Sequence, residues 1–155
     1  MLQIDAHNET EQEDIGGRLC AAMTGGCVVY LHGDLGAGKT TLVRGFLRFL
    51  GHVGAVKSPT YTLIEPYQAG GRDIYHLDLY RLGDPEELDY LGIRDLLDET
   101  AVLLVEWPER GLGELPAADI EVNIDYLNDG RRLQLHSRSP RGDSVLSRLQ
   151  PCLIR

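Results

Sequence analysis

Residues 27–50 of the chain read CVVYLHGDLGAGKTTLVRGFLRFL. The first part, Cys27–Leu31, is continuously apolar and rich in β-branched side chains, which predicts a strand buried on both faces. Thr40–Leu50 then places its apolar residues on one helical face, and Gly51 supplies the expected stop. A strand, a glycine-rich turn and a helix in this order are typical of an α/β domain.

The turn between strand and helix carries a phosphate-binding motif. Residues 33–40 match G-x-x-x-x-G-K-[ST] at every fixed position, in the strand-to-helix context that the motif requires. The glycines let backbone N–H groups converge on a polyphosphate at the positive end of the helix. We expect Lys39 to reach the β- and γ-phosphates and the Thr40 hydroxyl to ligate Mg²⁺. The predicted nucleotide contacts in this turn are Asp34, Leu35, Gly36, Ala37, Gly38, Lys39, Thr40 and Thr41.

The flanking segments extend the α/β pattern. Their periodicity predicts a helix over 9–23, a hairpin of strands 61–67 and 73–80, a helical stretch from Pro85 to Leu97, a second buried strand over 101–105, a second hairpin of strands 119–126 and 131–137, and a short helix over 143–149. The predicted fold is α/β and P-loop NTPase-like, a mainly parallel sheet flanked by helices with antiparallel hairpin additions. At 155 residues we expect a single domain over 1–155.

The composition of the chain excludes several classes of protein. The formal net charge is −9, with 43% hydrophobic and 25% charged residues, so disorder and unaided binding to nucleic acid are poor interpretations. The apolar runs are far shorter than the ~20 residues of a membrane span, and the acidic start does not resemble a secretory signal. Three cysteines without CxxC spacing indicate reduced thiols. We therefore expect a cytoplasmic protein with no membrane contact.

Two carboxylates are candidates for work beside the phosphates. Glu106 follows the apolar run 101–105, at the strand end where doubly wound sheets place their ligands. Asp78 lies within the more polar predicted strand 73–80. The alternatives are a surface carboxylate at the strand end for Glu106 and a solvated position on a hairpin face for Asp78. We predict catalytic roles for Lys39, Asp78 and Glu106, and Glu106 would either hold a metal ion together with Thr40 or position the attacking water. His76 is a weaker acid–base candidate, because a lone strand histidine is more often packed or on the surface.

Two further features have competing interpretations. Residues 58–62, Ser-Pro-Thr-Tyr-Thr, suit a switch-like loop facing the γ-phosphate, although hydroxyl-rich turns are common. Residues 84–99 are strongly acidic and residues 131–155 are rich in arginine. Each charged segment is either a solvated face or a surface that docks a partner of opposite charge.

Four strings in order carry a resemblance to a known family: HGDLGAGKTTLVRGFLRFLG, VKSPTYTLIEPY, YHLDLYRLGDPEELDYLGIRDLL and LLVEWPERG. Together they resemble the bacterial TsaE (YjeE) ATPases over nearly the whole chain. The resemblance implies an ATP-hydrolysing accessory subunit in the synthesis of tRNA threonylcarbamoyladenosine, which binds the TsaB–TsaD complex and drives its turnover. Contact with tRNA is then only indirect, through that complex.

The resemblance also implies roles for residues. Lys39, Thr40 and Thr41 match the family's phosphate and magnesium positions, Glu106 its magnesium carboxylate, and Asp78 its second acidic residue. Residues 58–62 match its switch-like loop. Arg131 aligns with a family position near the adenine, and Thr10 aligns less securely with a position on the other side of the base. These two residues complete the predicted ATP/ADP site.

Two other functions share the motif. A small P-loop kinase of a nucleoside or metabolite would need an acceptor pocket and an arginine-bearing lid, and no insertion of lid length follows the central helix. A GTP-binding switch generally carries Asn-Lys-x-Asp, and no asparagine of this chain is followed by lysine. The sequence therefore favours adenine over guanine.

Overall fold

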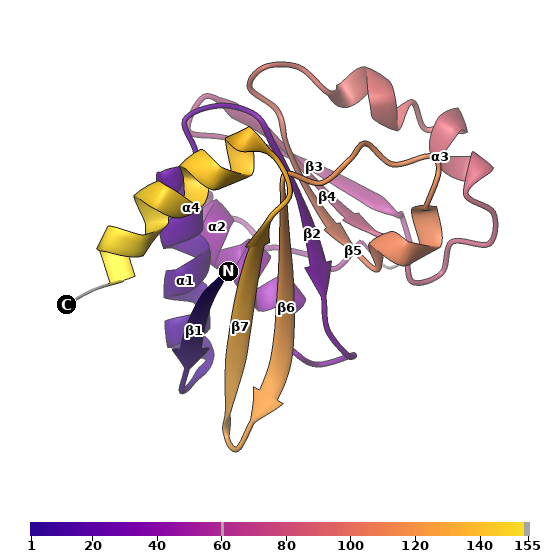
Figure 1. The fold of residues 1–155 in the computed structure, drawn as a ribbon. Coiled ribbons are helices and arrows are strands. Elements are labelled where there is room, and N and C mark those ends of the chain that lie inside the picture. Colours follow the sequence, from indigo (N-terminus) through magenta and orange to yellow (C-terminus); the bar gives the residue numbers. More distant parts are fainter. Residues whose placement is uncertain (60, 154–155) are drawn as a thin grey trace.

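A seven-stranded mixed sheet forms the middle of the molecule (Figure 1). The computed structural model describes residues 1–59 and 61–153. The strands are β1 (Leu2–Ala6), β2 (Cys27–His32), β3 (Ile64–Ala69), β4 (Arg72–Asp78), β5 (Val102–Glu106), β6 (Ile120–Leu127) and β7 (Gly130–Ser137). Their order across the sheet is β1-β7-β6-β2-β5-β4-β3. The four central strands, β6, β2, β5 and β4, pair in parallel, and the hairpin partners at both sides are antiparallel.

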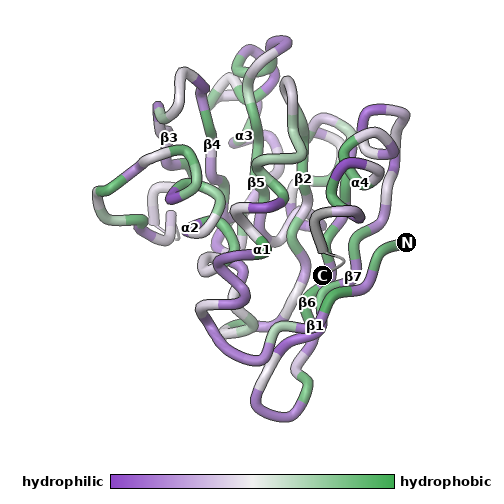
Figure 2. Tube along the Cα trace, turned by 90° about the vertical axis from the view of Figure 1, so that its left-hand side faces the viewer, coloured by the Kyte–Doolittle hydropathy of each residue, from purple (hydrophilic) through white to green (hydrophobic). Residues whose placement is uncertain are grey.

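The central strands are the apolar ones. Every residue of β5 is buried, as are most residues of β2, because helices cover both faces of the sheet there. Figure 2 shows hydrophobic residues gathered on these two strands and hydrophilic residues on the connecting loops. The predicted α/β architecture is thereby confirmed.

The helices divide unequally between the two faces (Figure 1). Three of them, α1 (Glu9–Ala22), α2 (Lys39–Phe49) and α4 (Pro140–Leu153), lie on one face and close the larger hydrophobic core with Val29, Leu104 and their neighbours. The short α3 (Glu86–Tyr90) and the 3₁₀ turn Ile93–Leu96 cover the other face over a smaller core. No helix within the described part of the chain is both long and apolar enough to cross a membrane.

Helix α1 packs closely on α2, the helix that follows the glycine-rich turn. A Cβ at Gly16 would lie 2.2 Å from the carbonyl oxygen of Leu42, and one at Gly45 would lie 1.9 Å from that of Glu13. Only hydrogen fits at these two positions, so the helix backbones touch. This contact fixes α1 beside the start of α2, where the phosphate-binding motif lies.

The predicted elements are present, and their bounds differ from the predicted ones in several places. Strand β1 has no counterpart in the prediction, because its five residues alternate without an apolar run and are held by pairing to β7. Strand β3 begins at Ile64 rather than at 61. The helical stretch after Pro85 breaks at Gly92, whose φ of 69° is left-handed. The closing helix is longer than predicted, Pro140–Leu153.

Candidate functional site

The glycine-rich turn joins the end of β2 to α2, with its carbonyl oxygens bound by side chains. The Tyr126 hydroxyl donates to the carbonyl of Leu35 at 3.0 Å. The Arg131 guanidinium donates to Ala37 at 3.1 Å and to Gly36 at 3.4 Å. Helix α2 has no side-chain cap at Gly38 among the residues that the structure describes. A helix start of this kind, after a turn whose carbonyls are hydrogen-bonded to side chains, suits the binding of an anion by the first-turn N–H groups.

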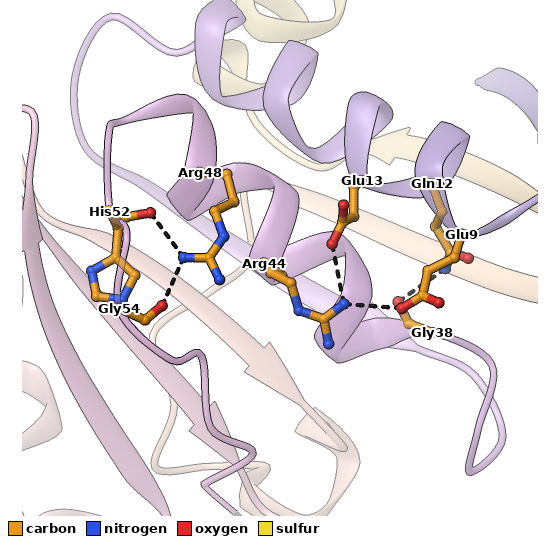
Figure 3. Close-up of polar contacts among 8 residues, drawn as sticks. All are labelled: Glu9, Gln12, Glu13, Gly38, Arg44, Arg48, His52 and Gly54. Atoms are coloured by element: carbon orange, nitrogen blue, oxygen red, sulfur yellow. Dashed lines mark hydrogen bonds and ion pairs between the residues drawn. The ribbon is translucent and has the colours of Figure 1, made fainter.

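Gln12 is a further support of the turn that the sequence did not single out. It projects from α1 toward Gly38 (Figure 3), and its Nε2 donates to the carbonyls of Ala37 at 3.2 Å and Gly38 at 2.9 Å. Its side chain is almost fully buried. The signal in the sequence is a polar residue on the buried stripe of the helix, three positions before Ile15 and seven before Leu19.

Ion pairs reinforce this contact between α1 and α2. Arg44 of α2 reaches Glu9 at 3.0 Å and Glu13 at 3.1 Å, on either side of Gln12 in the sequence (Figure 3). Further along the same helix, Arg48 donates to the carbonyls of His52 and Gly54 and so holds the loop that follows. Helix α1 is thereby tied to α2 beside the turn.

Lys39 begins α2 and is buried. Its Nζ donates to the carbonyl of Gly33 and lies 4.0 Å from the ring centroid of Trp107. Burial lowers the pKa of Lys39 below its ordinary value, and Glu106 and Asp78 oppose that shift by favouring the charged form. A phosphate would supply the same kind of stabilisation. Trp107, the residue directly after β5, thus lines the site as well.

Three polar side chains from three elements meet beside this lysine. Asp78 and Glu106 are register partners at the ends of the parallel strands β4 and β5. The Thr40 hydroxyl of α2 donates to Glu106 Oε2 at 3.2 Å. Both carboxylates are buried, which excludes the surface alternative for Glu106 and the solvated one for Asp78. Asp78 also accepts hydrogen bonds from the Ser58 hydroxyl at 3.4 Å and the Tyr80 N–H at 3.0 Å.

His76 lies directly behind Glu106. Its side chain has no exposure, and its Nε2 is 2.6 Å from Glu106 Oε2. The other ring nitrogen, Nδ1, is buried and has no hydrogen-bond partner among the residues that the structure describes. His76 is therefore a packed residue rather than a surface one. Its hydrogen bond is made to Glu106, which is one of the predicted site residues.

Two cavities meet at the glycine-rich turn. The first, which we call the carboxylate cavity, has a volume of about 310 Å³ and is lined by Leu35, Gly36, Gly38, Lys39, Thr40, Thr41, Ser58, Asp78, Glu106 and Trp107. The second, the hairpin cavity, has a volume of about 230 Å³ and is lined by Ala6, Asn8, Glu9, Gln12, Gly36, Gly38, Thr41, Asp129, Gly130 and Arg131. Gly36, Gly38 and Thr41 line both, so one elongated ligand can occupy the two together.

The donor set of the carboxylate cavity suits magnesium. Hydroxyl and carboxylate oxygens from Thr40, Asp78 and Glu106 are hard ligands. Across residues 1–59 and 61–153 there is no cluster of three or more His, Cys, Asp or Glu side chains that could enclose a metal ion. Mg²⁺ is usually held by one or two protein groups together with substrate phosphates, so these residues fit that ion better than a protein cage would.

Several predicted residues lie apart from these cavities. Thr10 is exposed on the first turn of α1 and is not in the hairpin cavity, where Glu9 and Gln12 lie instead. Asp34 is exposed and lines a different cavity, with Trp107 and Tyr126.

The switch-like segment reaches the carboxylate cavity through Ser58 alone among its described residues. Tyr61 is exposed beside Arg81, and Thr62 donates to Glu65. Thr60 lies outside the residues that the structure describes.

Comparison with known proteins gives consistent results. The family model "Threonylcarbamoyl adenosine biosynthesis protein TsaE" matches residues 6–134. The tRNA threonylcarbamoyladenosine biosynthesis protein TsaE of Haemophilus influenzae is 57% identical over 120 residues, which cover 77% of this chain and 76% of that protein. The Bacillus subtilis protein of the same name is 38% identical, over 81% of this chain and 78% of its own.

The fold is also similar to a solved structure. The crystal structure of YdiB from Bacillus subtilis superposes with a TM-score of 0.81, at 30% sequence identity. The superposition covers 97% of this chain and 95% of that one. The likeness therefore includes the hairpin additions as well as the parallel centre of the sheet.

Proposed function

The chain belongs to the TsaE family of threonylcarbamoyl adenosine biosynthesis proteins, and from this membership we propose that it is a magnesium-dependent ATPase of that pathway. One observation carries the proposal. The Thr40 hydroxyl and the Glu106 carboxylate lie 3.2 Å apart, at the mouth of a turn whose carbonyls are bound by side chains and whose helix has no side-chain cap among the described residues. Phosphoryl transfer requires this pairing of an anion cradle with metal-binding oxygens.

In this proposal each residue has a defined task. The first-turn N–H groups of α2 and the Lys39 ammonium bind the phosphates. Thr40 and Glu106 hold Mg²⁺, which when bound neutralises charge that develops on the phosphate oxygens. Asp78, at the same sheet edge, orients the attacking water. Water adds to the γ-phosphorus as the bond to the bridging oxygen breaks, which releases ADP and phosphate.

The nucleoside then extends into the hairpin cavity. This cavity shares Gly36, Gly38 and Thr41 with the carboxylate cavity, and Arg131 stands on its wall. The base is adenine in our proposal, on the absence of the guanine motif and on the family membership.

The partner in this proposal is the TsaB–TsaD complex, and hydrolysis drives the turnover of that complex. Family membership supports the partner, and the net charge of −9 supports indirect rather than direct contact with tRNA. Repulsion between an acidic chain and a phosphate backbone makes the protein complex the better docking target.

Glu106→Gln tests the proposal, because it keeps the size of the side chain and removes its charge. We expect near-normal ATP binding, strongly reduced hydrolysis and retained docking to TsaB–TsaD, with failure of repeated tRNA modification in a reconstituted system. Glu114→Gln, outside both cavities, is the matched control. Normal hydrolysis by Glu106→Gln would remove Glu106 from the site, and lost hydrolysis with undiminished multiple turnover would reject the role in turnover.

The same assay separates an ATPase from a small-molecule kinase. An ATPase releases phosphate without any acceptor, and its rate is unchanged when nucleosides or metabolites are added. Phosphate release that depends on an added acceptor would favour the kinase.

A further inference from the structure

His76 occupies a position where an apolar side chain is expected. Ile74, His76 and Asp78 alternate along β4, so they share the face of the sheet that α1 and α2 cover. His76 has no exposure, and its Nδ1 has no partner within the described residues. Burying an unpaired ring nitrogen is unfavourable, and a leucine or methionine would avoid that penalty. Packing alone therefore does not account for a histidine here.

The bonded nitrogen of the same ring points to a task. Nε2 lies 2.6 Å from Glu106 Oε2, and because a carboxylate only accepts hydrogen bonds, the proton of this bond belongs to Nε2. The Thr40 hydroxyl donates to that same oxygen from α2. Two donors from separate elements thus hold one oxygen of Glu106 and leave the other outside both hydrogen bonds.

The two donors differ in how firmly they are held. Thr40 lies in the first turn of α2, beside the nucleotide-binding turn. His76 lies inside the sheet, where β4 is paired on both sides, opposite Glu65 of β3 and Leu104 of β5. The imidazole is therefore anchored in the sheet by strand pairing on both sides, whereas Thr40 lies at the turn itself.

We propose that His76 is a positioning residue, which orients the Glu106 carboxylate for Mg²⁺ through the Nε2–Oε2 hydrogen bond. This inference rests on the proposed function, since it assumes that Glu106 binds the metal. Hydrogen-bond partners of metal ligands typically change metal affinity by about 10–100-fold when they are removed. The imidazole itself touches neither nucleotide nor metal in this arrangement.

Two substitutions of similar length isolate the hydrogen bond. His76→Gln can still place an N–H donor near the position of Nε2, whereas His76→Met fills the space without a donor. His136→Met, on β7 and outside both cavities, controls for the loss of a histidine. Trp107 is the only tryptophan of the chain and its ring centroid lies 4.0 Å from Lys39 Nζ, so its fluorescence reports on the site without catalysis.

The experiment titrates Mg²⁺ into each protein saturated with ADP and follows Trp107 fluorescence. We expect His76→Met to need about 10–100-fold more Mg²⁺ than the wild type, His76→Gln to need much less than His76→Met, and His136→Met to match the wild type. ADP binding in the presence of a chelator should be equal in all four, because Lys39 and the helix N–H groups carry it. Thermal unfolding without ligand verifies that each variant is folded.

Each contrary result has a distinct meaning. Equal Mg²⁺ dependence in the wild type and His76→Met would overturn the positioning role, and a glutamine variant as weak as the methionine one would overturn the hydrogen bond as its cause. If His76→Met does not fold, His76→Asn replaces it, since its shorter amide cannot reach Glu106. No Mg²⁺ dependence in the wild type would instead reject the proposed function, and this inference with it.

Discussion

Gln12 donates from α1 to two carbonyls of the glycine-rich turn, although 25 residues separate it from the nearer of them in the sequence. Both carbonyls have a second donor, the Arg131 guanidinium at Ala37 and the Leu42 N–H at Gly38. Gln12 therefore helps to orient two carbonyl groups that already have another hydrogen-bond donor. Its main effect should be on the shape of the turn, and only a smaller part on folding.

Gln12→Leu removes both hydrogen bonds to the turn and is expected to weaken ATP binding about tenfold, which corresponds to ~1.4 kcal/mol. The free energy of unfolding should fall by only about 1 kcal/mol, since each carbonyl keeps a partner. Nucleotide titration and urea unfolding measure the two quantities. Gln150→Leu, exposed on α4, is the control, and unchanged ATP affinity in Gln12→Leu would show that the turn keeps its shape without this side chain.

At the scale of elements, the contact between α1 and α2 places Gln12 and the turn side by side. Two adjacent glycines of α1, Gly16 and Gly17, contribute differently to this contact. A Cβ at Gly16 would lie 2.2 Å from a backbone oxygen of α2, whereas one at Gly17 would meet the Phe49 side chain at an ordinary 3.4 Å. Of these two glycines, only Gly16 is therefore required by the contact between the helices.

Gly16→Ala is expected to lower the free energy of unfolding by about 1–3 kcal/mol, because the helix backbones must separate. Gly17→Ala is expected to raise it by about 0.5–1 kcal/mol through helix propensity. Urea unfolding of the two variants makes a matched pair at neighbouring positions. Equal effects of the two substitutions would contradict the close backbone contact.

At the scale of the whole molecule, the structure places the acidic segment 84–99 and the arginine-rich segment that begins at 131. The described arginines of the last quarter of the chain all have partners within the molecule, several of them at its surface: Arg131 at the turn, Arg132 with Asp5, Arg138 with Glu121, Arg141 with Asp119, and Arg148 on the carbonyl of Ala22. This segment is therefore built into the fold by its own contacts. The acidic segment 84–99 lies across the sheet, on α3 and the turn after it (Figure 1).

Stability at alkaline pH is a second property of the whole molecule. Burial raises the pKa of Cys20 to about 11 and that of Cys27 to about 12, from 9.0. Above pH 9 the thiols ionise in the unfolded chain but not in the folded one. The unfolded state then binds fewer protons, so the free energy of unfolding falls as the pH rises through this window.

Replacing both thiols tests this directly. Urea unfolding of the wild type and of the double variant Cys20→Ala, Cys27→Ala should be compared at about pH 7.5, 9 and 10. We expect the double variant to be less stable at neutral pH, because small cavities form, and to lose less stability as the pH rises. Parallel declines in the two proteins would assign the alkaline loss to other groups.

The sequence by itself determined what depends on neighbouring residues. The order of strand, glycine-rich turn and helix, the apolar runs of β2 and β5, and the positions of Lys39, Thr40, Asp78 and Glu106 follow from local patterns, because hydrophobic period and turn chemistry act over a few residues. The four strings also sufficed to identify the family, since each motif has a fixed spacing within a short segment.

Only the tertiary structure decided which residues from distant segments meet. Strand β1 exists because β7 pairs with it, Gln12 reaches the turn because two glycines let α1 approach α2, and His76 meets Glu106 because β4 and β5 are neighbours in the sheet. The same kind of placement put Glu9 and Gln12, rather than Thr10, in the hairpin cavity. Such contacts depend on sheet order and helix packing, which are set by the burial of the whole chain and leave no local pattern.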